Sequence, residues 1–256
     1  MKKRLQPHIM CGVGDVAKYV LISGDPKRVE KIAALFDESS KVADYRGFIT
    51  YTGSIDGIGI SASSTGIGCP STAIVIEELA RVGAEIFIRV GTTGALQSNI
   101  EMGDIVIATA AVRGDGTSRC YLPLEFPAVA DLDVTTSLIE AARKLNQNVH
   151  VGPILTSDVF YSDIENLKFW SKHNVLSVEM ESSVIFTIAN LKKLKAGTIL
   201  AVDGNPILGT GKGEFEPGER TGELDPRVQN AIQNEALIAI EAVKSLENRL
   251  KTKHDK

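Results

Sequence analysis

Cysteine is scarce in this chain of 256 residues, which contains only Cys11, Cys69 and Cys120 and no C-x-x-C pair. An odd number of widely spaced cysteines argues against a disulfide framework and against a zinc site. We therefore expect these three residues to be small buried side chains in a reducing compartment.

The chain also lacks an excess of charge of either sign and any long apolar run. Its 28 lysines and arginines nearly balance 32 aspartates and glutamates. This balance argues against a general binder of nucleic acid or of a membrane surface, because such proteins have a basic bias. No apolar window is long enough to cross a membrane, and the basic segment Lys2-Lys3-Arg4 precedes no apolar signal core. We expect a cytoplasmic protein.

Several common catalytic signatures are missing as well. No G-x-G-x-x-G follows the first predicted strand, so a dinucleotide site is unsupported. The segment Gly209-Thr-Gly-Lys-Gly213 does not have the spacing of a phosphate loop, and no strand directly precedes it. The chain has no G-x-S-x-G, and only four histidines could serve a serine–histidine triad.

Apolar runs typical of strands alternate with segments of helical periodicity. The predicted strands are 19–23, 48–52, 58–64, 84–90, 104–112, 149–155, 175–178 and 198–202, and the predicted helices are 26–36, 70–82, 133–145, 179–194 and 226–250. Asp56-Gly57 predicts a hairpin turn, residues 207–223 a loop or lid, and residues 251–256 a frayed tail. The sequence predicts an α/β three-layer sandwich with a mixed central sheet between helices, in a single domain over residues 1–256.

The segment Ala84–Ala95 organises this pattern. Its apolar strand should stop at the turn Gly91-Thr-Thr-Gly94, and it contains Arg89, whose guanidinium is costly to bury alone. Either Arg89 meets an internal carboxylate or a solvent-exposed edge, or it grips an anion with Thr92 beyond the end of the strand.

A second junction combines a strand end with a cation. Asp25 and Pro26 are typical of a helix start after the first strand, and Arg28 falls in the first helical turn. Because a helix N-terminus favours anions, an external anion explains Arg28 better than helix stability does, although a surface salt bridge is the ordinary alternative.

At this point the chain resembles a known family. The motifs Gly24-Asp-Pro with Arg28, Arg46-Gly-Phe, Arg89-Val-Gly-Thr-Thr-Gly94, Ser157-Asp-Val-Phe-Tyr161 and Val178-Glu-Met-Glu181 occur in the order seen in the nucleoside phosphorylases. That family includes hexameric purine nucleoside phosphorylases and uridine phosphorylases. The resemblance extends from about His8 to the C-terminal helix.

The resemblance implies a role for each matching residue. Phosphate binding falls to Gly24, Arg28, Arg46, Arg89 and Thr92, because guanidinium groups pair well with phosphate oxygens. The nucleoside is bound by residues that match its ribose and base sites, namely His8, Thr93, Gly94, Phe160, Glu179, Met180 and Glu181. For these residues the structural alternatives stay open, since Met180 and Phe160 could be core and His8 a terminal residue.

The implied reaction is phosphorolysis of an N-glycosidic bond, with Arg89 and Asp203 as catalytic residues. Asp203 is the candidate general acid for a purine N7, a role that requires a raised pKa. The Val202-Asp203-Gly204 segment resembles the purine enzymes, whereas Thr65–Thr72 and Pro123–Asp131 resemble the uridine phosphorylases. We favour a purine nucleoside, with uridine second and a nucleosidase or a non-catalytic nucleoside-binding protein as further alternatives.

The family pattern also implies partners. His8 and Arg46 would be lent across an interface, so the resemblance implies a homo-oligomer, a hexamer built as three dimers. Inorganic phosphate is a co-substrate, and no metal, organic cofactor, nucleic acid or membrane partner is expected.

Overall fold

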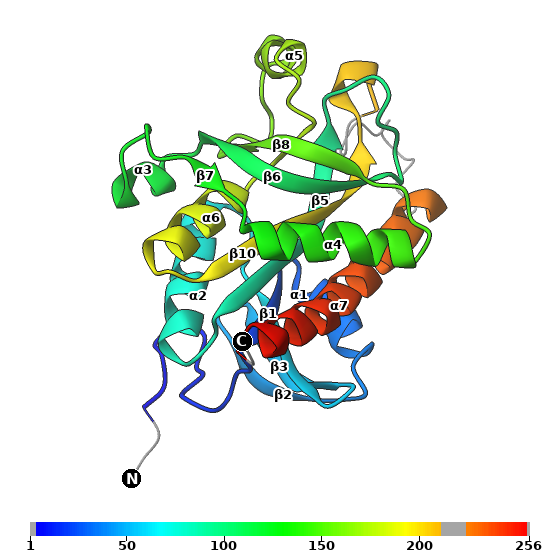
Figure 1. Ribbon diagram of the computed structural model, residues 1–256. Helices are drawn as coiled ribbons and strands as arrows, with labels where there is room; N and C mark the ends of the chain where they lie inside the picture. Colours follow the sequence, from blue (N-terminus) through cyan, green and yellow to red (C-terminus); the bar gives the residue numbers. More distant parts are fainter. Residues whose placement is uncertain (1–3, 211–223, 255–256) are drawn as a thin grey trace.

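The structure is a computed structural model that describes residues 4–210 and 224–254. Helices cover both faces of one mixed sheet (Figure 1). The strands are β1 Tyr19–Ser23, β2 Glu38–Tyr45, β3 Phe48–Ile55, β4 Ile58–Ser64, β5 Ile86–Ala95, β6 Ile105–Gly114, β7 Ala128–Val129, β8 His150–Ser157, β9 Ser177–Glu179 and β10 Lys195–Gly204. The helices are α1 Pro26–Ala33, α2 Cys69–Arg81, α3 Thr117–Tyr121, α4 Leu132–Lys144, α5 Ile164–Lys172, α6 Ser182–Leu191, the 3₁₀ turn η1 Pro206–Leu208 and α7 Pro226–His254.

The sheet has an open part and a closed part. The strand order is β10-β6-β8-β9-β5-β1-β4-β3-β2, and β10 also pairs with β5. Strands β5, β9, β8, β6 and β10 therefore form a ring, while β1, β4, β3 and β2 extend from it. The predicted α/β sandwich with a mixed sheet is confirmed, but the prediction did not include this closure.

Alternate residues of the central strands serve two separate cores. In β5, Phe87 joins the cluster under α2 and α6, whereas Ile86 and Ile88 join the cluster under α1, α4 and α7. Both faces are thus apolar, which explains why β5 begins with three consecutive apolar residues, Ile86, Phe87 and Ile88, rather than with an alternating pattern. Among the described residues, no helix is long and apolar enough to cross a membrane.

Two local predictions are confirmed in detail. Asp25 caps α1, and its side chain accepts from the backbone N–H of Lys27 at 2.9 Å, with Pro26 in the first helical position. The β3–β4 hairpin turns at Asp56 and Gly57, whose φ angles of 49° and 75° are the left-handed values that a tight hairpin needs.

Other boundaries were wrong. Strand β5 does not stop at Gly91 but continues through the Gly-Thr-Thr-Gly segment to Ala95, because β10 and β9 pair with it there. Strand β2, with a mostly exposed burial pattern, and helix α5 were not predicted.

The C-terminal half adds three corrections. Helix α6 begins at Ser182 rather than Glu179, and α7 continues to His254 instead of fraying from Lys251. Of the predicted loop 207–223, the first residues complete η1, and residues 211–223 lie outside the described residues. Cys11 and Cys69 are buried as expected, whereas Cys120 is exposed.

Candidate active site

Arg89 is a buried cation in the middle of β5, with 4% of its surface exposed. Its Nε donates to Oε2 of Glu179 at 2.9 Å, and its Nη2 lies 2.5 Å from Oε2 of Glu181. Burial by itself would lower the pKa of Arg89, but the carboxylates of Glu181 and Glu179 outweigh it and raise that pKa above its ordinary value. Arg89 is therefore a permanent cation whose Nη1 lies outside both pairs.

The position of this guanidinium depends on Gly91. A Cβ at Gly91 would lie 2.9 Å from Cζ of Arg89 and 3.0 Å from both Nη atoms. The side chain of Arg89 thus folds back over the backbone of its own strand, in space that only glycine leaves empty.

Glu179 is committed to donors of the protein itself. Its Oε1 accepts from Oγ1 of Thr156 at 2.5 Å, and its Oε2 accepts from the backbone N–H of Glu181 at 2.9 Å. The N–H of Ser182, the first residue of α6, donates to both oxygens at 3.0 and 2.9 Å. With these bonds and Arg89, Glu179 orients the guanidinium and caps the start of α6.

Glu181 lies where the β9–α6 junction meets the start of α2. Its Oε1 accepts from the backbone N–H of Gly68 at 2.7 Å, and the carbonyl of its neighbour Met180 accepts from Sγ of Cys69 at 3.3 Å. Burial raises the pKa of Glu181, Arg89 opposes this shift, and Glu179 adds to it.

Gly24 and Arg28 approach from the end of β1. A Cβ at Gly24 would lie 3.1 Å from the carbonyl oxygen of Gly66, so the β1–α1 and β4–α2 junctions are in close contact. The side chain of Arg28 is 13% exposed, and its Nη1 lies 3.8 Å from Oε1 of Glu235 in α7. The ordinary alternative for Arg28, a salt bridge, is thus present, but its partner is fully buried.

The strand register aligns these groups. Strands β1, β4, β5 and β10 run parallel where they pair, so their carboxyl ends share one edge of the sheet. Arg89 pairs with Ile22, next to the last residue of β1, and thus lies level with the junction that carries Gly24 and Arg28.

The end of β5 is occupied by Thr92, Thr93 and Gly94. Oγ1 of Thr93, which is 2% exposed, donates to the carbonyl of Val178 at 2.8 Å, and Gly94 pairs with the same residue of β9. Thr92, the preceding residue of the strand, lies on the opposite face of the sheet from Thr93 and is half-buried. Thr93 and Gly94 therefore fix β9 against β5, which brings Glu179 to Arg89.

Asp203 lies within β10 rather than just past it. The register shifts between Val202, which pairs with Thr93, and Gly204, which pairs with Gly94. Asp203 is thus the extra residue of a bulge, a feature that redirects a side chain at a strand end. Its charge adds to the raised pKa of Glu235 on α7.

The comparisons with known proteins identify the family. The family model described as the phosphorylase superfamily matches residues 18–244. The chain belongs to the phosphorylase superfamily. It is 44% identical to a guanosine phosphorylase of Halorubrum lacusprofundi over 94% of this chain and 99% of that protein. It is also 44% identical to a uridine phosphorylase of Thermococcus kodakarensis, over 94% of this chain and 87% of that protein.

The fold of this superfamily member is also that of solved relatives. A uridine phosphorylase of Vibrio fischeri superimposes with a TM-score of 0.86 at 30% identity, over 94% of this chain and 97% of that one. The Escherichia coli uridine phosphorylase is 43% identical over 73% of this chain and 79% of its own length. The predicted family is confirmed, and proteins named for a purine and for a pyrimidine nucleoside are equally similar.

Arg89 and the two carboxyls that it contacts, Glu179 and Glu181, form what we call the Arg89 cluster. Three predicted site residues of this phosphorylase-superfamily chain have no contact with it among the described residues. Nδ1 of His8 lies 2.6 Å from Oε1 of Glu78 on α2, and Arg46 is exposed at the β2–β3 turn with a φ of 54°. Phe160 is 52% exposed and meets Tyr161 edge-on, with ring centroids 5.0 Å apart.

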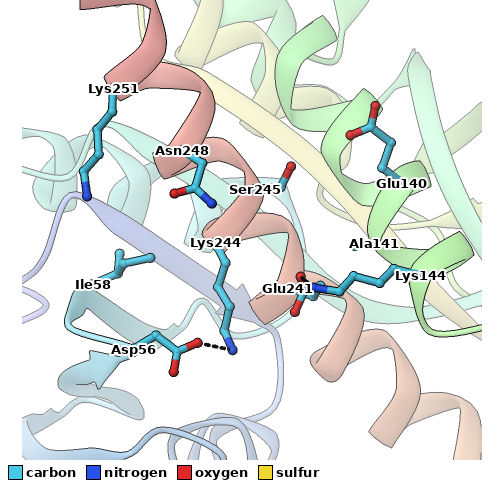
Figure 2. A pocket seen from close by; sticks show the side chains of 10 residues that line it. All are labelled: Asp56, Ile58, Glu140, Ala141, Lys144, Glu241, Lys244, Ser245, Asn248 and Lys251. Atoms are coloured by element: carbon cyan, nitrogen blue, oxygen red, sulfur yellow. Dashed lines mark hydrogen bonds and ion pairs between the residues drawn. The ribbon is translucent and has the colours of Figure 1, made fainter.

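A cavity of about 500 Å³ lies elsewhere, between α7, α4 and the β3–β4 turn. Figure 2 shows two ion pairs among the residues that line it, Lys244 with Asp56 at 2.6 Å and Lys144 with Glu241 at 2.5 Å. It lies by the first residue of β4, far along the strand from the carboxyl end, and its cations are already paired. This cavity therefore does not coincide with the predicted site residues.

The sequence analysis missed Glu235 and the supporting role of Thr156. Glu235 had a signal, since it interrupts the buried stripe of Ala231, Ile238 and Ala242 on α7 with a single carboxyl. Thr156 had none, because its contact with Glu179 depends on the pairing of β8 with β9. Among the described residues, no group of three histidine, cysteine, aspartate or glutamate side chains could hold a metal ion.

Proposed function

We propose that the protein is a nucleoside phosphorylase that cleaves a purine ribonucleoside with inorganic phosphate. The supporting observation is that Arg89, paired with Glu181 at 2.5 Å, lies level with the end of β1, from which Arg28 follows in the first turn of α1. Two guanidinium groups next to a carboxyl that can accept from sugar hydroxyls suit a phosphate and a ribose bound side by side.

In the proposed reaction a phosphate oxygen bonds to the anomeric carbon of the ribose while the bond from that carbon to the base nitrogen breaks. The bonding electrons leave with the base, and the products are free base and ribose 1-phosphate. Arg28 and Arg89, with Gly24 and Thr92, orient the phosphate, whose negative charge stabilises the cationic sugar of the transition state. Glu181 accepts from the sugar hydroxyls.

Asp203 supports a purine as the leaving group. The bulge in β10 turns this carboxyl out of the regular ladder at the end of the strand, where it can donate to N7 of a purine as the bond breaks. The relative named guanosine phosphorylase, covered almost completely by this chain, favours the same substrate class. Uridine is the second candidate, because several relatives of 38–44% identity are named uridine phosphorylase.

We further propose that the chain acts as one domain in a cytoplasmic homo-oligomer, a hexamer of three dimers. His8 and Arg46 lie outside the Arg89 cluster of their own chain, so we propose that they complete the site of a neighbouring copy. If so, mixing an inactive His8→Ala variant with an inactive Asp203→Asn variant should restore activity, because some sites receive both intact residues. Mixtures that stay inactive, with each variant folded, would contradict a shared site.

The function is tested by substrate and by phosphate together. The protein is incubated with inosine, guanosine, adenosine, methylthioadenosine and uridine, with and without phosphate, and free base and ribose 1-phosphate are measured. We expect phosphate-dependent release of a purine. Base release without phosphate would indicate a nucleosidase instead, and turnover of uridine alone would establish the second candidate.

A further inference from the structure

Helix α7 places one carboxyl in the interior beneath the candidate phosphate site. Glu235 has 0% of its surface exposed, whereas its helix neighbours Glu241 and Glu247 reach the outer face and pair with Lys144 and Lys251. Neither oxygen of Glu235 has a hydrogen-bond partner of normal geometry among the described residues, although the backbone N–H of Ala201 on β10 is close enough to lower its pKa slightly. An ionised carboxylate without hydrogen bonds is costly to bury, so this position calls for an explanation.

The charged groups around Glu235 all belong to the candidate site. They are Arg28 on α1, Arg89 on β5 and Asp203 on β10. Helix α4, which also packs on α7, directs Glu140 and Lys144 to Arg249 and Glu241 on the outer face. The state of Glu235 is therefore coupled to the two cations that would hold phosphate and to the proposed general acid.

The contact between Arg28 and Glu235 is loose. Nη1 of Arg28 lies 3.8 Å from Oε1 of Glu235, which is an ion pair but too long for a hydrogen bond. Burial raises the pKa of Glu235 to about 8, and Arg28 only partly offsets it. At neutral pH the carboxyl is mostly a neutral acid, and Arg28 keeps its charge for another partner.

We propose that Glu235 is a positioning residue for phosphate, which binds when the Glu235 carboxyl holds a proton and Arg28 is released to the anion. This inference rests on the proposed function. When Glu235 loses its proton, the carboxylate competes with phosphate for Arg28 and repels the anion. Phosphate binding and proton uptake at Glu235 are then linked, and the link operates above neutral pH.

The expected effect follows from this linkage. Above about pH 8 inorganic phosphate is already a dianion, so its own titration changes little. With the carboxyl half ionised at about pH 8, phosphate affinity should fall about fivefold between pH 8 and pH 9. Glu235→Gln keeps the size and neutrality of the protonated acid, so its affinity should change less than about twofold over this range.

The test is calorimetric titration of the whole protein with inorganic phosphate alone, in buffers of different ionisation enthalpy. At about pH 8.5 the wild-type protein should take up about three quarters of a proton per phosphate bound, and Glu235→Gln should take up almost none. Glu241→Gln, on the outer face of the same helix, is the matched control and should behave as wild type.

The outcomes separate the two proposals. If neither the wild-type protein nor either variant binds phosphate at any pH, the proposed function is refuted. If phosphate binds but the affinity and the proton uptake of Glu235→Gln equal those of wild type, the role of Glu235 is refuted and the phosphorylase assignment stands. If Glu235→Gln does not fold, proton uptake by the wild-type protein is the remaining test. Phosphate binding without proton uptake at about pH 8.5 would overturn the inference.

Discussion

Adding a single methyl group at Gly91 should impair the site although no charged residue is replaced. A Cβ there would lie 2.9 Å from Cζ of Arg89 and 3.0 Å from Nη1 and Nη2. Contacts below about 3 Å cannot persist, so the guanidinium must move by several tenths of an ångström. Contacts of 2.9 Å to Glu179 and 2.5 Å to Glu181 fix its present position, and the movement disturbs both of them.

Two magnitudes follow for Gly91→Ala. Overpacking of this kind costs about 1–3 kcal/mol of stability, which should lower the melting temperature by several degrees. Displacing a phosphate-orienting cation by a fraction of an ångström should reduce kcat/KM for phosphate by about ten- to a hundredfold, with KM for the nucleoside less affected.

The measurement is steady-state kinetics with varied phosphate, together with thermal unfolding. Gly59→Ala is the matched control, because this strand glycine has an ordinary backbone and its Cβ would meet only Cβ of Ala17 at 3.6 Å. If Gly91→Ala retains wild-type kcat/KM for phosphate, the close approach of Arg89 to its own strand is not required for phosphate binding, and the reasoning fails.

Three further predictions concern Asp203, Thr156 and Glu235. Asp203→Asn should reduce turnover at least a hundredfold while nucleoside binding, measured by calorimetry, stays near wild type; a variant with normal turnover would remove Asp203 from the reaction. Thr156→Val removes the bond to Glu179 and leaves the N–H of Ser183, which donates to Oγ1 of Thr156 at 2.9 Å, without its acceptor. It should cost about 1–3 kcal/mol in urea unfolding, and an unchanged midpoint would contradict this. Because the folded-state pKa of Glu235 is raised to about 8, its stabilising contribution is complete below its unfolded pKa and is lost as pH rises through 8. The advantage of Glu235→Gln over wild type in unfolding free energy should therefore grow by up to about 1.4 kcal/mol per pH unit between the ordinary value of 4.5 and about 8 and level off above it, and parallel pH curves would exclude such a shift.

Local chemistry made part of the fold predictable. The cap at Asp25 and the hairpin at Asp56-Gly57 depend on neighbouring residues alone, and both are confirmed. The Gly91-Thr-Thr-Gly94 segment reads as a turn by composition, but tertiary pairing with β9 and β10 holds it as strand. The ring closure that causes this pairing joins strands far apart in the chain and has no local signal.

The candidate site was predictable to the same extent. Arg28, Arg89 and Asp203 could be singled out because each follows or interrupts an apolar strand, and all three contribute to the pKa of Glu235. The two interpretations of Arg89, an internal salt bridge and an anion site, do not exclude each other. The guanidinium pairs with internal carboxylates and still leaves Nη1 outside those pairs. The length of the Arg28–Glu235 contact depends on how α7 packs, which residue types do not specify.

The three-residue strand β9 has a consequence for how the enzyme can diversify. It is clamped between β5 and β8, so one inserted residue would reverse the facing of its side chains and turn Glu179 away from Arg89. The exposed stretch around Phe160, between β8 and α5, has no such partners on either side. Loops of that kind can lengthen or change composition to suit another base, while the anion end of the site keeps its geometry.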